Sequence, residues 1–123
     1  MPHDPASPLR LHGIPTCGTV KKARQWLDAQ GIAYQYVDLR ETPPSAEEVA
    51  AWVAKVGAQA LKNTSGGSYR ALGPKKDAYQ EADWQAAFAT DPMLIKRPVL
   101  VGPSGLLAVG FSETTWAKLG LRP

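Results

Sequence analysis

The sequence predicts a single α/β domain that runs strand, helix, strand, then a helical middle, a β-hairpin and a final helix. Short apolar runs flank an amphipathic segment at 19–30, which indicates a βαβ unit with parallel strands and a right-handed crossover. Two further apolar runs surround a Gly-Pro-Ser-Gly turn at 102–105, which is typical of a hairpin. Helical periodicity fills the sequence between them. At 123 residues, the chain is long enough to form a core without disulfides.

The composition is that of a soluble globular protein, with 44% hydrophobic and 20% charged residues. No apolar run approaches the roughly 18 residues of a membrane span, and the net charge of +3 does not indicate nucleic-acid binding. A single cysteine excludes an internal disulfide and favours a reducing compartment, so we expect a cytoplasmic protein. Residues 1–8 hold three prolines and resemble neither a signal peptide nor a transit helix. We expect a flexible tail there, followed by one domain over 9–120 with a helical insertion at about 43–92.

The βαβ unit is predicted from periodicity. Residues 8–14 form the first strand, the amphipathic segment Thr19–Gln30 forms the helix, and Ile32–Arg40 form the second strand. Gly31 ends the helix as a C-terminal cap would. The apolar face of this helix consists of Val20, Ala23 and Leu27, with Trp26 beside them.

The middle of the chain is predicted to be helical with one long loop. Ser45 and Glu48 have the spacing of a capping box and open a helix. Its apolar face is predicted to hold Val49, Trp52, Val53 and Val56. Residues 61–73 indicate a loop, followed by a short helix at 75–80 and another at 81–90. The inward face of this last helix is predicted to hold Trp84, Ala87 and Phe88.

The end of the chain is predicted to be a hairpin and a helix. Residues 97–111 supply the two strands, and Ser112 is placed as an N-cap. Phe111 and Trp116 have the spacing of a hydrophobic staple, and the last helix is expected to carry Trp116 and Leu119.

Cys17 lies where the first strand gives way to the helix. The free amides and the dipole of a helix N-terminus favour an anion, and the nucleophilic form of cysteine is the thiolate. Lys21 and Lys22 add positive charge one turn further on, and Gly18 permits close approach of a substrate. This placement favours a reactive thiol over a free cysteine that merely packs.

Three familiar cysteine chemistries do not fit the local sequence. A phosphatase loop needs Cys-x5-Arg, but the nearest arginine, Arg24, stands one place late. A dithiol redox site needs Cys-x-x-Cys, but the fourth position is Val20. Neither His3 nor His12, which is expected on the first strand, has metal-ligand spacing from Cys17, so no metal site is expected. A second thiol would therefore have to come from another molecule.

Four segments together resemble the ArsC family, most closely its YffB-like branch: GIPTCGTVKKARQWLDAQGIAYQYVDLRETPPS, ALKNTSGGSYRALG, LIKRPVLV and VGFSE. The resemblance runs from Leu9 to about Leu119. It implies a thioredoxin-like fold with a helical insertion and one reactive cysteine, Cys17. Taken alone, Lys96 and Arg97 indicate two solvated cations before an edge strand, but the resemblance places Arg97 and a cis Pro98 beside the thiol.

Cys17 and Arg97 are accordingly the expected catalytic residues. The residues expected to bind substrate or glutathione are Thr16, Gly18, Thr19, Lys21, Lys96 and Pro98. The Arg97 guanidinium is expected to stabilise the thiolate and to pair with a carboxylate of glutathione.

The chain departs from the family where arsenate would be held. The resemblance implies three arginines around the thiol in glutaredoxin-linked arsenate reductases, and only Arg97 matches. The arginine that those reductases carry in the middle loop corresponds to Asn63 here. The YffB-like branch usually has an arginine two places later, which corresponds to Ser65, and the third arginine corresponds to a position near Gly110. Because each charge-assisted contact contributes about 1.5–3 kcal/mol, affinity for an oxyanion is expected to be low.

The resemblance implies a monothiol, glutathione-dependent thiol/disulfide reductase. Glutathione or another small thiol is the expected co-substrate and glutaredoxin a candidate partner, with no bound cofactor, nucleic acid or membrane and a monomeric state. The alternatives are a glutaredoxin-linked arsenate reductase and, from another class, a non-catalytic regulator like the related Spx proteins, which bind RNA polymerase. Such regulators commonly carry a Cys-x-x-Cys switch, which Val20 excludes here.

Overall fold

The structure, a computed structural model, describes residues 7–123 and divides into two compact units. Unit 1 combines the described residues up to Asp38 with Arg97–Pro123, and unit 2 is Leu39–Lys96, which includes the insertion expected at about 43–92. The predicted tail at 1–6 lies outside the described residues. Ser7, also assigned to the tail, differs from that prediction: its side chain is 8% exposed and donates a hydrogen bond to the Ala33 carbonyl oxygen.

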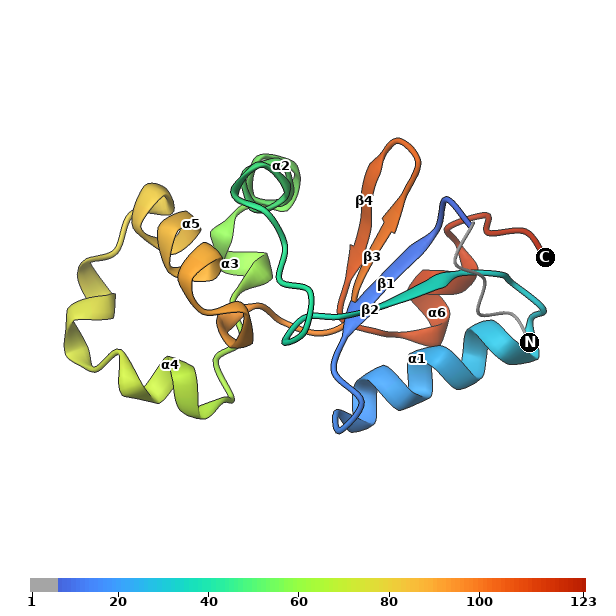
Figure 1. Ribbon diagram of the computed structural model, residues 1–123, viewed down its shortest axis with the longest axis horizontal. Helices are drawn as coiled ribbons and strands as arrows, with labels where there is room; N and C mark the ends of the chain where they lie inside the picture. The colour runs from blue at the N-terminus through green and yellow to red at the C-terminus, as the bar shows by residue number, and fades with distance from the viewer. Residues whose placement is uncertain (1–6) are drawn as a thin grey trace. The chain divides into compact units, whose positions relative to one another are not determined.

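Unit 1 is built on a four-stranded mixed sheet (Figure 1). Its strands are β1 (Arg10–Gly13), β2 (Gln35–Asp38), β3 (Val99–Gly102) and β4 (Gly105–Val109). The strand order is β2-β1-β3-β4, with β1 parallel to β2 and antiparallel to β3. The predicted βαβ unit and hairpin are therefore confirmed, although β2 is shorter than the predicted 32–40.

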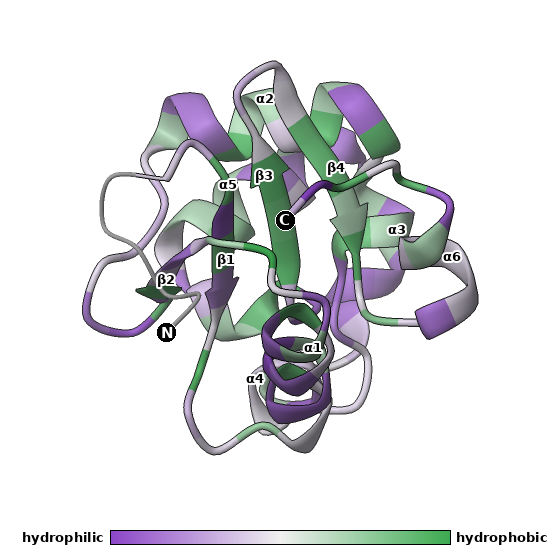
Figure 2. Ribbon diagram, turned by 90° about the vertical axis from the view of Figure 1, so that its right-hand side faces the viewer, coloured by the Kyte–Doolittle hydropathy of each residue, from purple (hydrophilic) through white to green (hydrophobic). Residues whose placement is uncertain are grey.

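Two helices pack on one face of this sheet, as Figure 1 shows: α1 (Gly18–Ala29) and α6 (Glu113–Ala117). The apolar face of α1 is buried as its periodicity predicts, and β3 is the hydrophobic strand drawn in green in Figure 2. The core contains Leu9, Leu11, Ala23, Leu27, Ile32, Tyr34, Leu100 and Trp116. Ser112 caps α6 by accepting a hydrogen bond from the Thr115 amide. The rings of Phe111 and Trp116 meet edge to face at 4.8 Å, which confirms the staple.

Unit 2 is helical apart from one isolated antiparallel β-bridge between Lys62 and Ile95. Its elements are α2 (Ala46–Val56), α3 (Ala58–Leu61), α4 (Gly67–Ala71), the 3-10 helix η1 (Pro74–Ala78), α5 (Glu81–Thr90) and the 3-10 helix η2 (Pro92–Leu94). The capping box of Ser45 and Glu48 is present, and α2 packs against α3 and α5.

Three details of unit 2 differ from the predictions. The predicted loop at 61–73 contains helix α4, because Arg70 and Leu72 close backbone hydrogen bonds within one turn. Val56 was expected in the core, but it is 36% exposed because α2 ends at the next residue, Gly57, whose φ is +84°. Ala87 is only half-buried on α5, whereas Trp84 and Phe88 are buried as predicted.

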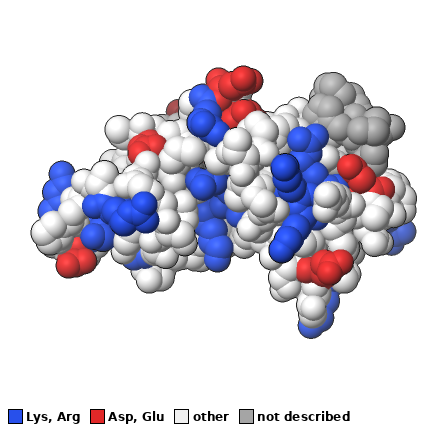
Figure 3. Space-filling model, turned by 90° about the horizontal axis from the view of Figure 1, so that it is seen from below, with Lys and Arg blue, Asp and Glu red and all other residues white. Residues whose placement is uncertain are grey.

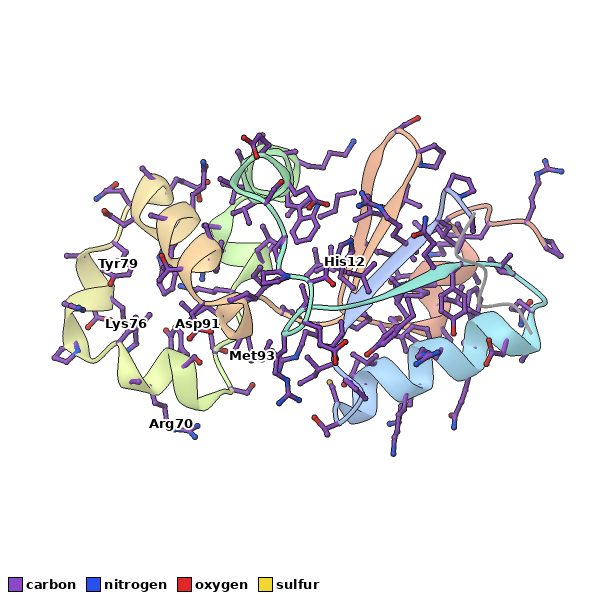
Figure 4. The ribbon with its side chains drawn as sticks, in the orientation of Figure 1. His12, Arg70, Lys76, Tyr79, Asp91 and Met93 are labelled. Atoms are coloured by element: carbon purple, nitrogen blue, oxygen red, sulfur yellow. The ribbon has the colours of Figure 1, made fainter. Side chains whose placement is uncertain are left out.

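Aromatic rings stabilise the interior of unit 2 around Trp84. Tyr69 stacks on Trp84 at 6.1 Å, Tyr79 meets it edge to face at 5.0 Å, and Phe88 lies 5.9 Å away. The Lys76 ammonium lies 4.9 Å from the Tyr69 ring centre, and Figure 4 labels Lys76 and Tyr79. Each such contact adds about 0.5–1.5 kcal/mol to the free energy of burial.

Within residues 7–123, no helix is long and apolar enough to cross a membrane. On the face shown in Figure 3, lysine and arginine side chains form separate groups, and acidic side chains lie in smaller groups on the same face.

Candidate active site

Cys17 lies at the N-terminus of α1, just beyond β1. The Cys17 amide donates to the Ile14 carbonyl oxygen at 3.3 Å and closes the turn that follows the strand. Cys17 is the N-cap residue of α1, with φ −86° and ψ 123°, and its carbonyl oxygen accepts the first helical bond from the Lys21 amide at 3.1 Å. Its side chain is partly exposed, so the sulfur is held at a helix start and is open to solvent.

The surroundings of the Cys17 thiol favour the thiolate. Burial alone raises the pKa of Cys17. That effect is outweighed by the Val20 and Thr19 amides at the helix start and by the Arg97 guanidinium, all of which favour the charged thiolate, so the pKa of Cys17 lies below its ordinary value. The amide contribution fits the helix-start argument. Lys21 and Lys22, expected to contribute, are exposed and are not among the groups that shift this pKa.

Arg97 reaches the thiol from the segment that precedes β3. The Arg97–Pro98 peptide bond is cis, as the family resemblance implies. Pro98 is buried, and its carbonyl oxygen accepts a hydrogen bond from the Gly110 amide at 2.7 Å, which ties this segment to the end of β4. Arg97 is half-buried, and its guanidinium lowers the pKa of Cys17. The local interpretation of Arg97 as a solvated cation therefore does not describe its half-buried side chain, and the catalytic role of Arg97 stays a prediction.

The other predicted site residues have different placements. Thr16, Gly18 and Thr19 adjoin the thiol in sequence and are exposed. A Cβ atom added to Gly18 would meet nothing within 4 Å, so the space beside this residue is open to a ligand. Lys96 belongs to unit 2, where its amide donates to the Leu61 carbonyl oxygen at 2.6 Å.

Comparisons with known proteins agree with the observed fold. Residues 12–119 match the ArsC family. The chain belongs to the ArsC family. Its relatives include the YusI protein of Bacillus subtilis, 39% identical over 109 residues that cover 85% of this chain and 92% of YusI. An arsenate reductase of Escherichia coli is 29% identical over 101 residues, which cover 80% of this chain and 72% of that protein.

A solved structure titled YffB is 35% identical to this ArsC-family chain, with a TM-score of 0.83. The match covers 90% of this chain and 97% of the YffB chain. The fold is thus thioredoxin-like, as the resemblance implies, and the YffB-like likeness is confirmed.

At the positions where the resemblance implies further arginines, this ArsC-family protein has residues with structural roles. Gly110 is buried with φ +76°, a conformation that disfavours an arginine. In unit 2, the Asn63 side chain accepts a hydrogen bond from the Ser65 amide and donates one to the Met93 carbonyl oxygen. The Ser65 carbonyl oxygen accepts a hydrogen bond from Arg70, which Figure 4 labels. Of the three arginines that the resemblance implies around the thiol, only Arg97 is therefore present, and it lies in unit 1.

The sequence predictions missed a polar and aromatic cluster that joins α1 to β2. Arg24 of α1 donates from Nε to the Tyr34 hydroxyl at 3.0 Å, and its guanidinium carbon lies 4.1 Å from the centre of the Tyr36 ring. Burial and then the Asp38 carboxylate raise the pKa of Tyr36, Arg24 lowers it, and Cys17 raises it further. This coupling places Tyr36 within electrostatic range of the thiol. One signal was available: Arg24 follows Cys17 by seven residues, which is two helical turns.

His12 was expected on the first strand and lies on β1, where it is 2% exposed. Figure 4 labels it. Within residues 7–123, no group of three His, Cys, Asp or Glu side chains is placed to hold a metal ion.

Proposed function

We propose that this ArsC-family chain is a monothiol thiol/disulfide reductase in which Cys17 is the nucleophile and glutathione is the reducing co-substrate. The observation that carries the proposal is the combination of two helix-start amides and the Arg97 guanidinium at one partly exposed sulfur. Such surroundings lower a thiol pKa and keep the nucleophilic thiolate available near neutral pH.

Cys17 takes part in two exchange steps. In the first, the Cys17 thiolate attacks one sulfur of a disulfide, forms a mixed disulfide and releases the other sulfur as a thiolate. In the second, the thiolate of glutathione attacks the substrate sulfur of the mixed disulfide, forms a new mixed disulfide with it and releases the Cys17 thiolate. These two steps leave the substrate as one free thiolate and one mixed disulfide with glutathione. A second glutathione thiolate then attacks the glutathione sulfur of that mixed disulfide, forms oxidised glutathione and releases the other substrate thiolate. The two electrons that reduce the substrate disulfide therefore come from two glutathione molecules, and the protein itself returns unchanged.

An external thiol is required because the chain has a single cysteine. The cytoplasm supplies such thiols in reduced form, and we place the reaction there. The exposed residues Thr16, Gly18 and Thr19 are the proposed contacts for the backbone of the small thiol. Their amides and hydroxyls are suited to peptide groups.

Arsenate reduction is the second candidate, and it rests on the relatives that bear the name arsenate reductase. The Cys17 thiol could attack arsenate. However, the buried Gly110 stands where the resemblance implies an arginine, so the site lacks that positive charge for an oxyanion. We therefore rank disulfide reduction first.

Intact-mass spectrometry after incubation with oxidised glutathione tests the first step. The expected result is one glutathione adduct on the wild-type protein, none on Cys17→Ser, and removal of the adduct by reduced glutathione. Quantitative failure to form the adduct, with Cys17 still alkylated by iodoacetamide, would overturn the proposal and favour a regulator that acts only by binding.

A further inference from the structure

The guanidinium of Arg24 is held in a fixed position that no step of thiol exchange uses. Its Nε donates to the Tyr34 hydroxyl at 3.0 Å, and Tyr34 is 1% exposed, so the anchor is rigid. The guanidinium group of Arg24 also lies over two aromatic rings. Its central carbon is 4.1 Å from the centre of the Tyr36 ring and 5.8 Å from the centre of the Tyr34 ring. Both tyrosines stand on or next to β2, beside the core of unit 1.

The two terminal nitrogens of Arg24 remain available for a ligand. The structure shows no hydrogen bond or ion pair from them to any of residues 7–123, and Arg24 is only half-buried. A guanidinium fixed through Nε presents its two Nη groups as a planar fork, which matches the two oxygens of a carboxylate. The side chain has already lost its conformational freedom, so less entropy is lost when an anion binds.

The distance to the thiol fits a small peptide thiol. Cys17 caps the helix that carries Arg24, and their separation of seven residues corresponds to about two helical turns, or about 10 Å along the axis. One extended residue spans about 3.5 Å, so a carboxylate one residue from a cysteine lies roughly 7–9 Å from that sulfur. A disulfide bond to Cys17 adds about 2 Å. A tripeptide-sized thiol joined to Cys17 can therefore bring a terminal carboxylate to Arg24.

Lys21 lies between these two residues on the same side of α1 and is exposed. Its ammonium adds positive charge along the path of the ligand. The Asp38 carboxylate also acts on this stack, since it raises the pKa of the Tyr36 hydroxyl. The surface from Cys17 to Arg24 thus offers a nucleophile at one end and a fixed cation at the other.

We propose that Arg24 binds a terminal carboxylate of the small-thiol co-substrate and so selects anionic peptide thiols over neutral ones. This inference rests on the proposed function for its biological meaning, but not for its physical test. Arg24 is a binding residue here, and Tyr34 positions it.

Binding of S-methylglutathione, which cannot exchange, tests the inference without chemistry. Titration calorimetry is expected to show binding to the wild-type protein and about tenfold weaker binding to Arg24→Gln, the loss of one charge-assisted contact. The dimethyl ester of the same ligand should bind both proteins equally weakly. Lys118→Gln, which removes an exposed cation of unit 1 just after α6, is the matched control and should leave the affinity unchanged. Equal affinity of wild type and Arg24→Gln for S-methylglutathione, or no binding to either, would overturn the inference.

Two further variants separate recognition from folding. Tyr34→Phe keeps the ring but removes the oxygen that holds Nε, and it should weaken S-methylglutathione binding less than Arg24→Gln does. Arg24→Lys keeps the charge but loses the fork and should bind less well than wild type. Equal losses for the ligand and its dimethyl ester in all three variants would indicate a structural role and refute carboxylate recognition.

A reaction arm keeps the inference separate from the proposed function. The rate of adduct formation with oxidised glutathione should fall about tenfold in Arg24→Gln, whereas the rate with the neutral 2-hydroxyethyl disulfide should not change. If neither disulfide reacts with the wild type but S-methylglutathione binding still depends on Arg24, the reductase proposal fails and carboxylate recognition stands. If both disulfides react equally fast with wild type and Arg24→Gln, the reductase stands and the inference fails.

Discussion

Gly13, the last residue of β1, controls how closely the strand packs against the start of α1. A Cβ atom added there would lie 2.8 Å from both γ-methyl groups of Val20, well inside van der Waals contact. Val20 is 1% exposed and β-branched, so it has no free rotamer to relieve the overlap. The Val20 amide is also one of the groups that lower the pKa of Cys17. Gly13→Ala therefore forces the first turn of α1 away from the sheet.

Overpacking of this kind costs about 1–3 kcal/mol. We expect Gly13→Ala to lower the free energy of unfolding by about 2 kcal/mol. For a chain of this size, that corresponds to a fall in melting temperature of about 8 °C. Alkylation of Cys17 by iodoacetamide should slow at the same time, because the Val20 amide moves with the helix.

A double-mutant cycle in urea, followed by circular dichroism, tests the reasoning. Val20→Ala removes both clashing methyl groups and leaves the Cβ atom at 3.4 Å, an ordinary contact. Val20→Ala should itself cost about 2 kcal/mol, but Gly13→Ala should then add almost nothing, which gives a coupling energy of about 2 kcal/mol. The control is Gly18→Ala, since an added Cβ there meets no atom within 4 Å. Unchanged stability in Gly13→Ala, or equal losses in both backgrounds, would refute the steric argument.

Three other predictions follow from the structure. The alkylation rate of Cys17 should rise with pH through an inflection below the value of about 8.5 for a free thiol, and Arg97→Gln should move that inflection upward; an inflection at or above the free-thiol value in the wild type would contradict the description of the site. Because the pKa of Cys17 is lower in the folded state, the unfolded chain binds more protons at pH values between the folded and unfolded pKa. The difference in free energy of unfolding between wild type and Cys17→Ser should therefore increase with pH up to about 8.5 and then level off. Urea titrations at several pH values measure this difference, and a difference that does not change with pH would refute the prediction. Arsenite production with glutathione and glutaredoxin should be weak, because Gly110 supplies no guanidinium; robust, Cys17-dependent turnover would show that Arg97 alone suffices.

Much of the fold was predictable because local rules and tertiary packing agree. Val20, Ala23 and Leu27 recur at helical spacing and are all buried in α1. Ser45 and Glu48 form the capping box that their spacing predicts. The helix α4 was missed because Gly66 and Gly67 favour a loop by propensity, and the hydrogen bonds that close its turn are not visible in a sequence pattern.

The site was predictable only in part. The position of Cys17 at a helix start follows from the local sequence, since the apolar strand and the helical pattern meet there. Arg97 lies far along the chain, and local physics indicated a solvated cation; only the resemblance placed it at the thiol. Arg24 and Tyr36 could not be joined in advance, because their contact depends on the register between β1 and β2, which the sequence does not specify.

The two places where the chain leaves and re-enters unit 1 lie on either side of β1. Asp38 ends β2 opposite Gly13, and Val99 begins β3 opposite His12, so both junctions stand at the carboxyl end of β1, from which Cys17 follows. Two strand spacings separate them, about 10 Å. Any segment whose two ends match this spacing can therefore join the strands of unit 1 without a change in their pairing. Because Arg97 is the residue at which the chain re-enters unit 1, the end of that segment also leads directly into a residue that lowers the pKa of Cys17.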